Sequence, residues 1–210
     1  SMSPAGTFLS ISLIDTDGCG FRKMSERPMK KICVPLANGF EEIEAITLID
    51  VLRRAGFHVT TCGLSGLPQR GAHDVTVTAD TTIEDALRSS WDLVVLPGGM
   101  PGATNLRDDA RVGQLLEQTV KNGGFVGAIC AAPIVLARFG ILDGRKATSY
   151  PGFQAQMPGV QYREDRVVFD GNILTSRGPG TAMEFALAIT ELLAGPDKAK
   201  ELRKQMLAPC

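Results

Sequence analysis

The sequence predicts an α/β protein in which a mostly parallel sheet is covered by helices on both faces. Short apolar runs of strand length alternate with longer segments of helical periodicity from Lys31 onward. The runs at 32–36 and 93–96 are compact and apolar, as expected of strands buried at the centre of a sheet. Turn formers such as Asn38-Gly39 separate strands from helices.

The individual elements follow from local patterns. Residues 32–36 form the first predicted strand, and the helix over 41–55 ends before Gly56, which acts as its C-cap. Further strands are predicted at 57–62, 93–96, just before Cys130, and at 146–149, 167–169 and 173–175, with a small hairpin or edge element at 74–79. Further helices are predicted at 83–87, 109–122, from the Cys130 turn to about 139, and at 181–193 and 197–206.

This alternation predicts a single domain over residues 31–210. Residues 1–30 lack periodicity and carry several turn formers, so we expect a disordered or poorly ordered N-terminal extension. A formal net charge of -1 argues against nucleic acid or an anionic membrane as the main partner. No run approaches the ~18 consecutive apolar residues of a membrane span.

The chain has five cysteines, which are widely spaced and contain no CxxC pair. This pattern indicates neither a disulfide framework nor a zinc site, and it suits a reducing compartment such as the cytoplasm. With only two histidines in the chain, a histidine-rich metal site is not expected. We therefore predict no metal and no cofactor.

The segment GFVGAICAAP at 124–133 predicts a buried strand that turns abruptly into a helix at Cys130. Such an elbow holds its residue in a strained conformation and points the side chain at a cleft. Free amides at a helix start favour negative charge, so the pKa of a thiol here is expected to fall. The local pattern is equally compatible with a small buried hydrophobic residue.

Glu44 lies on an otherwise apolar stripe of the predicted helix at 41–55. Desolvation there would raise the pKa of its carboxyl and keep it protonated. A protonated carboxyl could donate a hydrogen bond to a thiolate and transfer the proton during a reaction. The pattern alone slightly favours another interpretation, in which Glu44 belongs to an acidic first turn with Glu41 and Glu42.

Gly98 and Gly99 follow the strand at 93–96 and leave their amides uncovered. Such amides, with the N–H of Ala131, could bind a developing oxyanion. An ordinary glycine-rich turn is the alternative, whereas the patterns of a phosphate-binding loop are absent. The carboxyl ends of parallel strands meet at one sheet edge, so Glu44, the glycines and Cys130 are predicted to converge.

Several motifs together resemble the DJ-1/ThiJ/PfpI superfamily, and most closely its DJ-1 branch. They are EEIE at 41–44, RRAG at 53–56, LPGG at 96–99, AICAAP at 128–133 and LTSRGPGT at 174–181. The resemblance runs in unbroken order from about Lys31 to the C-terminus. It implies a flavodoxin-like fold and a homodimer, with an arginine pair, here Arg53 and Arg54, near the dimer interface.

The resemblance also implies a chemistry. Cys130 would be an oxidation-sensitive nucleophile, Glu44 its protonated partner, and the glycine and Ala131 amides the oxyanion site. The implied activity is a glutathione-independent glyoxalase or protein deglycase, of hydro-lyase or hydrolase type, that acts on methylglyoxal-type oxoaldehydes or glycated proteins. The alternative is a non-enzymatic redox sensor or chaperone of the oxidative stress response. A peptidase or amidotransferase is disfavoured because Ala131, not histidine, follows Cys130.

Two positions depart from the family pattern. Tyr150 stands where many members of the branch have a histidine near the cysteine. A phenol with a pKa near ~10 cannot act as a base at neutral pH, so Tyr150 is predicted to hydrogen-bond or line the site while Glu44 carries the proton. His73 replaces an arginine near the dimer cleft, which predicts weaker anion binding there.

Overall fold

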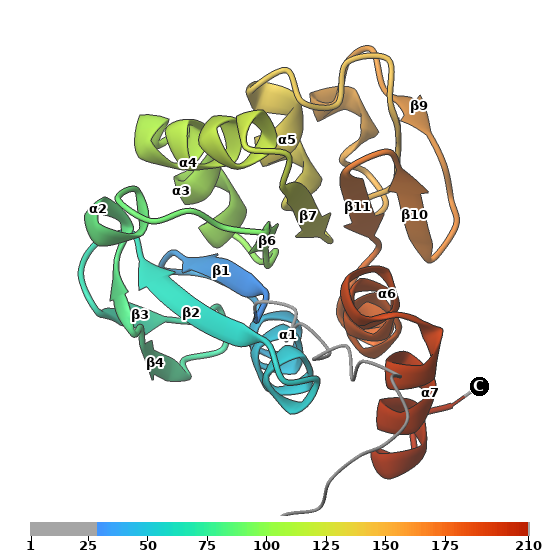
Figure 1. Ribbon diagram of the computed structural model, residues 1–210. Coiled ribbons are helices and arrows are strands. Elements are labelled where there is room, and N and C mark those ends of the chain that lie inside the picture. Colours follow the sequence, from blue (N-terminus) through green and yellow to red (C-terminus); the bar gives the residue numbers. More distant parts are fainter. Residues whose placement is uncertain (1–28, 210) are drawn as a thin grey trace, which may run out of the picture.

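The computed structural model describes residues 29–209 and confirms the α/β fold class (Figure 1). A seven-stranded sheet runs in the order β10-β11-β7-β6-β1-β2-β5. Its strands are β1 (Lys31–Leu36), β2 (His58–Gly63), β5 (Thr81–Thr82), β6 (Leu93–Leu96), β7 (Phe125–Ile129), β10 (Val167–Asp170) and β11 (Ile173–Ser176). All neighbours are parallel except β10 and β11, which are antiparallel.

Helices cover both faces of this sheet (Figure 1). One face carries α1 (Glu42–Arg54), α6 (Ala182–Ala194) and α7 (Pro196–Gln205), and the other carries α2 (Ile83–Ala86), α3 (Gly102–Asp108), α4 (Ala110–Lys121) and α5 (Pro133–Arg138). Each layer has its own apolar core, with Phe185 in the first and Leu116 in the second fully buried. The sheet thus lies between two buried layers, which is why its central strands are apolar throughout.

The chain reverses direction across the sheet between β1 and β6. From β1 it proceeds through α1 to β2 on one side, and later returns to place β6 on the other side of β1. A crevice at such a switch point is where open parallel sheets bind ligands. The start of α1, the loop after β6 and the turn after β7 all lie at this carboxyl edge.

The small hairpin predicted at 74–79 is confirmed, because β4 (Thr76–Thr78) pairs with β3 (Pro68–Arg70), a strand that was not predicted. A second small sheet pairs β8 (Lys146–Ala147) with β9 (Gln161–Tyr162), which was also not predicted. The predicted strand at 146–149 stops at Ala147 because the Thr148 amide donates instead to Oγ1 of Thr175. Most of the predicted N-terminal extension, residues 1–28, lies outside the described residues. Along residues 29–209, no helix has the length and apolar character needed to cross a membrane.

Candidate active site

Cys130 occupies a strained elbow between β7 and α5. Its φ of 64° lies in the left-handed region, which costs a non-glycine residue about 1–2 kcal/mol. Two backbone hydrogen bonds hold it there: its amide donates to the Ser176 carbonyl at 3.0 Å, and its carbonyl accepts from the Tyr150 amide at 2.8 Å. The side chain remains partly exposed. The predicted elbow is therefore present, and neighbouring strands and loops fix its direction.

Glu44 faces Cys130 from the first turn of α1. Its side chain is fully buried, and Oε2 accepts a 2.7 Å hydrogen bond from the Gly98 amide. A Cβ placed on Gly98 would lie 2.7 Å from Cβ of Cys130 and 2.8 Å from Oε2 of Glu44, so the two side chains flank Gly98 closely. Oε1 of Glu44 is buried and has no hydrogen-bond partner among the described residues. A proton on Oε1, directed at the sulfur, would satisfy this oxygen.

Burial raises the pKa of Glu44 to about 7, as its place on an apolar stripe predicts. The Gly98 hydrogen bond and the Cys130 thiol oppose this rise without cancelling it. Glu44 is consequently a carboxyl that gains and loses a proton near neutral pH, which is the property required of a proton relay.

The pKa of Cys130 does not follow the expectation of a lowered value. Burial and then the Glu44 carboxylate raise it to about 12, while the amides of Ala131 and Gly99 act in the opposite direction. Helix α5, on which the expectation of a lowered pKa relied, has six residues and begins only at Pro133. A thiolate therefore requires that Glu44 hold the proton, and the two side chains act as one acid pair.

The amides of the two glycines after β6, Gly98 and Gly99, point at different groups. The amides of Gly99 and Ala131 point at the Cys130 sulfur and are placed to stabilise negative charge there. Gly98, which we predicted as an oxyanion donor, instead donates its amide to Glu44. Gly99 has a φ of 93°, and a Cβ there would lie 2.3 Å from the Glu41 amide, so only glycine fits.

Tyr150 reaches the site through its backbone. Its amide bonds the Cys130 carbonyl, while its side chain is 48% exposed and packs near Gly178. The phenol makes no hydrogen bond to the described residues, so a catalytic role for Tyr150 stays a prediction. The neighbouring Ser149 carbonyl accepts from the Tyr162 hydroxyl at 3.2 Å and from Nε of Arg177 at 3.3 Å.

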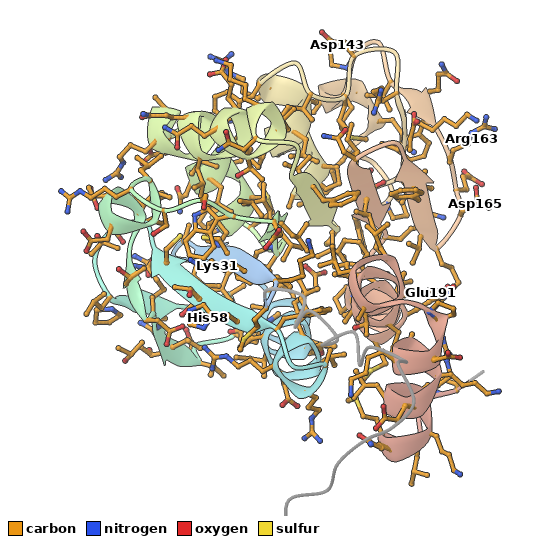
Figure 2. All side chains as sticks on the ribbon, viewed as in Figure 1. Lys31, His58, Asp143, Arg163, Asp165 and Glu191 are labelled. Carbon is orange, nitrogen blue, oxygen red and sulfur yellow. The ribbon has the colours of Figure 1, made fainter. Side chains whose placement is uncertain are left out.

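The histidines do not join the acid pair. His58 pairs with Lys31 where β2 and β1 begin, at the end of the sheet away from the elbow (Figure 2). His73 instead contacts Glu42, with Nδ1 2.8 Å from Oε2. The two predicted core cysteines, Cys33 and Cys62, are buried with their sulfurs 3.4 Å apart.

Sequence reasoning missed the supporting role of the LTSRGPGT segment. Ser176 holds the Cys130 amide through its carbonyl, and its hydroxyl lies 2.6 Å from that of Thr181. Thr181 in turn bonds the amides of Arg177 and Gly178. The hydroxyl-rich composition of this segment was the available signal, because such side chains commonly fix turns.

Comparison with known proteins relates this chain to a single protein family. The model of the DJ-1/PfpI family matches residues 30–192. Protein dj-1beta of Drosophila melanogaster is 46% identical over 181 residues, which are 85% of this chain and 97% of that protein. The glutathione-independent glyoxalase DJR-1.2 of Caenorhabditis elegans is 40% identical over 167 residues, covering 79% of this chain and 89% of that protein.

Solved structures show the same relationship. The crystal structure of Drosophila melanogaster DJ-1beta has a TM-score of 0.84 and 45% identity, and the match covers 87% of this chain and all of that one. The structure of oxidized Toxoplasma gondii DJ-1 has a TM-score of 0.82 and 40% identity, covering 85% of this chain and 98% of that one.

Proposed function

This chain belongs to the DJ-1/PfpI family, and on that premise we propose that it is a cysteine-dependent glyoxalase and protein deglycase. The observation that carries the proposal is the acid pair: a partly exposed cysteine beside a buried carboxyl whose pKa is about 7. The name of the 40% identical worm relative, a glutathione-independent glyoxalase, supports the same reaction class. Its substrates would be methylglyoxal-type oxoaldehydes.

The first step would be addition of the Cys130 thiolate to the aldehyde carbon of methylglyoxal. A C–S bond forms, and the carbonyl electron pair moves onto oxygen, which takes the Glu44 proton to give a hemithioacetal. The amides of Gly99 and Ala131, which already favour negative charge at the sulfur, would lie close to the developing oxyanion.

The second step would move hydrogen between the two oxygen-bearing carbons. The Glu44 carboxylate removes the proton from the carbon bonded to sulfur, and the adjacent carbonyl oxygen takes up a proton to give an enediol. Glu44 then returns its proton to the adjacent carbon while the hydroxyl on the sulfur-bearing carbon loses its own, which gives a lactoyl thioester. Water then attacks this thioester, the C–S bond breaks, and lactate leaves with regeneration of the thiol. The net reaction adds one water and needs neither glutathione nor a redox partner.

The direct test is lactate formation from methylglyoxal by the purified chain. Cys130→Ala should abolish turnover, whereas Cys62→Ala, a matched loss of a buried thiol, should retain it. A rate for Cys130→Ala equal to that of the unmodified chain would refute the proposal. Release of hydroxy acid from a freshly glycated peptide tests the deglycase activity in the same way.

A redox sensor or chaperone is the second candidate, and the solvent-facing Tyr150 favours it, because its phenol supplies no base to the acid pair. Cys130 would be oxidised by peroxide through a sulfenic to a sulfinic acid, each step consuming one peroxide. A gain of two oxygen atoms confined to Cys130, in a protein that forms no lactate, would select this function. Oxidation spread equally over Cys62 and Cys130 would exclude it.

We further propose a homodimer that forms through α1. Ile43 and Ile46 lie on its outer side and are 58% and 43% exposed, and Val75, 51% exposed, is linked to the same helix by Glu42. Large exposed apolar side chains grouped on one helix are typical of an interface. Ile46→Glu should convert a dimer to a monomer in light scattering.

The free thiols of the described residues favour a cytoplasmic location, since a reducing compartment keeps thiols in this state.

A further inference from the structure

Arg177 belongs to one of the two peptide groups that hold Cys130 and bonds the other. The first is the peptide between Ser176 and Arg177, whose carbonyl accepts the Cys130 amide at 3.0 Å. The second is the peptide between Ser149 and Tyr150, whose amide donates to the Cys130 carbonyl at 2.8 Å. Nε of Arg177 donates to the carbonyl of this second peptide at 3.3 Å. One side chain therefore links the two segments that lie on either side of Cys130.

These hydrogen bonds form a closed ring. Strand β11 runs parallel to β7 and places Ser176 beside Ile129, the last residue before the elbow (Figure 1). From the Cys130 amide the ring passes through the Ser176 carbonyl to Arg177. The Arg177 side chain then bonds the Ser149 carbonyl, and the amide of that same peptide returns to Cys130. Hydrogen bonds that are joined through peptide groups polarise and strengthen one another, so loss of one bond weakens the others.

The Arg177 guanidinium is directed at backbone oxygens. Nη1 donates to the Glu164 carbonyl at 3.2 Å, so both hydrogen bonds that the guanidinium makes to the described residues end on a main-chain carbonyl. Charged donors form stronger hydrogen bonds than neutral ones, and the planar guanidinium reaches two acceptors in fixed directions. The Tyr162 hydroxyl supports the same Ser149 carbonyl at 3.2 Å. The half-buried arginine thus fixes the backbone beside the elbow.

The elbow needs such support because the φ of 64° at Cys130 is strained. In this conformation the sulfur lies beside Glu44 and the amides of Gly99 and Ala131. A relaxed backbone would turn the sulfur away from these groups. We propose that Arg177 is a positioning residue that keeps Cys130 in its reactive conformation. The inference deepens the proposed function and rests on it, because it takes Cys130 as the reacting group.

The test is the rate at which iodoacetamide alkylates Cys130 in the full chain, followed by peptide mass spectrometry. Arg177→Gln should slow alkylation at pH 8 about 10-fold or more, because a displaced sulfur loses the groups that stabilise its thiolate. Arg166→Gln is the matched control. It removes a neighbouring guanidinium that bonds Glu184 and the Gly180 carbonyl, and it should leave the rate unchanged. Arg177→Lys keeps the charge without the planar group and should recover part of the rate.

Two further readouts separate positioning from a general loss of structure. The Tyr150 amide should exchange with solvent faster in Arg177→Gln, whereas the amides of β6 should not change. For methylglyoxal, kcat should fall about 10-fold while KM stays within about 2-fold, because Arg177 is not expected to bind substrate. Tyr162→Phe removes only the hydroxyl that bonds the Ser149 carbonyl, so it should slow alkylation less than Arg177→Gln does. It replaces Arg177→Gln in the test if that variant does not fold.

The proposal is overturned if Arg177→Gln is alkylated as fast as the unmodified chain, or if Arg166→Gln loses as much. Should Arg177→Gln fail to fold, an unchanged rate in Tyr162→Phe overturns it. Alkylation requires no substrate turnover, so this result is independent of lactate formation. A chain that forms no lactate but shows the expected alkylation rates contradicts the proposed enzyme activity and supports the role of Arg177.

Discussion

The molecule holds thiols in two contrasting settings. Cys33 and Cys62 lie on the central strands β1 and β2, fully buried and 3.4 Å apart. Cys130 lies where β7 ends, partly exposed, beside a carboxyl and two backbone amides. Burial raises the pKa of both Cys33 and Cys130, so a raised thiol pKa does not distinguish them.

The difference lies in what surrounds each sulfur. The neighbour of Cys33 is another thiol, which favours the neutral form. Cys130 has a carboxyl that can take its proton and amides that stabilise the resulting charge. Reactivity in this fold therefore follows from position at a strand end, where backbone amides are free, and not from the cysteine itself.

The largest expected effect is in the rates of thiol oxidation. Dilute peroxide should oxidise Cys130 about 10³-fold faster than Cys33 or Cys62, because the core thiols react only after local opening. Peptide mapping by mass spectrometry over a time course gives the three rates. Comparable rates at Cys62 and Cys130 would remove the distinction between the two settings.

Glu44→Gln should lower kcat for methylglyoxal about 10²–10³-fold, since an amide cannot relay the proton. In the unmodified chain the rate should fall as the pH drops below about 7, where both members of the acid pair hold their protons and no thiolate forms. Lactate production from pH 5.5 to 8.5 measures both effects. A flat profile that is the same in the two proteins would contradict the role of Glu44.

Glu44 should also make stability depend on pH in an unusual direction. Its folded pKa of about 7 exceeds its ordinary 4.5, so its contribution is complete below pH 4.5 and is lost as the pH rises through 7. The loss amounts to about 3 kcal/mol of unfolding free energy. Urea unfolding of the unmodified chain and of Glu44→Gln, each at pH 5 and pH 8, measures this pH-dependent contribution to the unfolding free energy, because the variant lacks the titrating carboxyl.

A smaller contrast separates two glycines. A Cβ at Gly98 would lie within 2.8 Å of Cys130, Glu44 and the Ile129 carbonyl, whereas at Gly127 the nearest atom would be a Val95 methyl at 3.1 Å. Gly98→Ala should therefore cost about 2 kcal/mol and displace the acid pair, and Gly127→Ala less than about 1 kcal/mol. Chemical denaturation of the two variants measures the unfolding free energy that each one loses. Equal losses would mean that the surroundings of Gly98 pack no more tightly than those of Gly127.

The sequence predicted elements whose pattern is continuous and missed those fixed by distant contacts. The apolar run at 93–96 matches β6 residue for residue. The buried Glu44 agrees with its place on an apolar stripe, although the pattern alone slightly favoured an acidic first turn. Helix α3 was missed because it begins at Pro101-Gly102, a pair that reads locally as a turn. Its first turn is held by the Gly99 carbonyl, which accepts from Ala103, a bond that the local pattern does not reveal.

At the site, residue types were predictable but their hydrogen-bond partners were not. Gly98 was identified as a site residue with a free amide. That amide donates a hydrogen bond to Glu44, because α1 and the loop after β6 come together only in the folded protein. The raised thiol pKa follows from that same meeting, since the carboxylate is among its main causes. His73 and Glu42 are distant in sequence, and the turn that follows β3 brings them together.

The left-handed backbone of Cys130 bears on how this chain can evolve. Glycine adopts a φ of 64° without strain, so a lineage under selection for stability alone would drift toward glycine at this position. A cysteine retained in such a conformation lowers the stability of the fold, so its retention indicates selection for its chemistry. Loss of that chemistry in a descendant should leave a recognisable mark: a glycine at the elbow of an otherwise unaltered sheet.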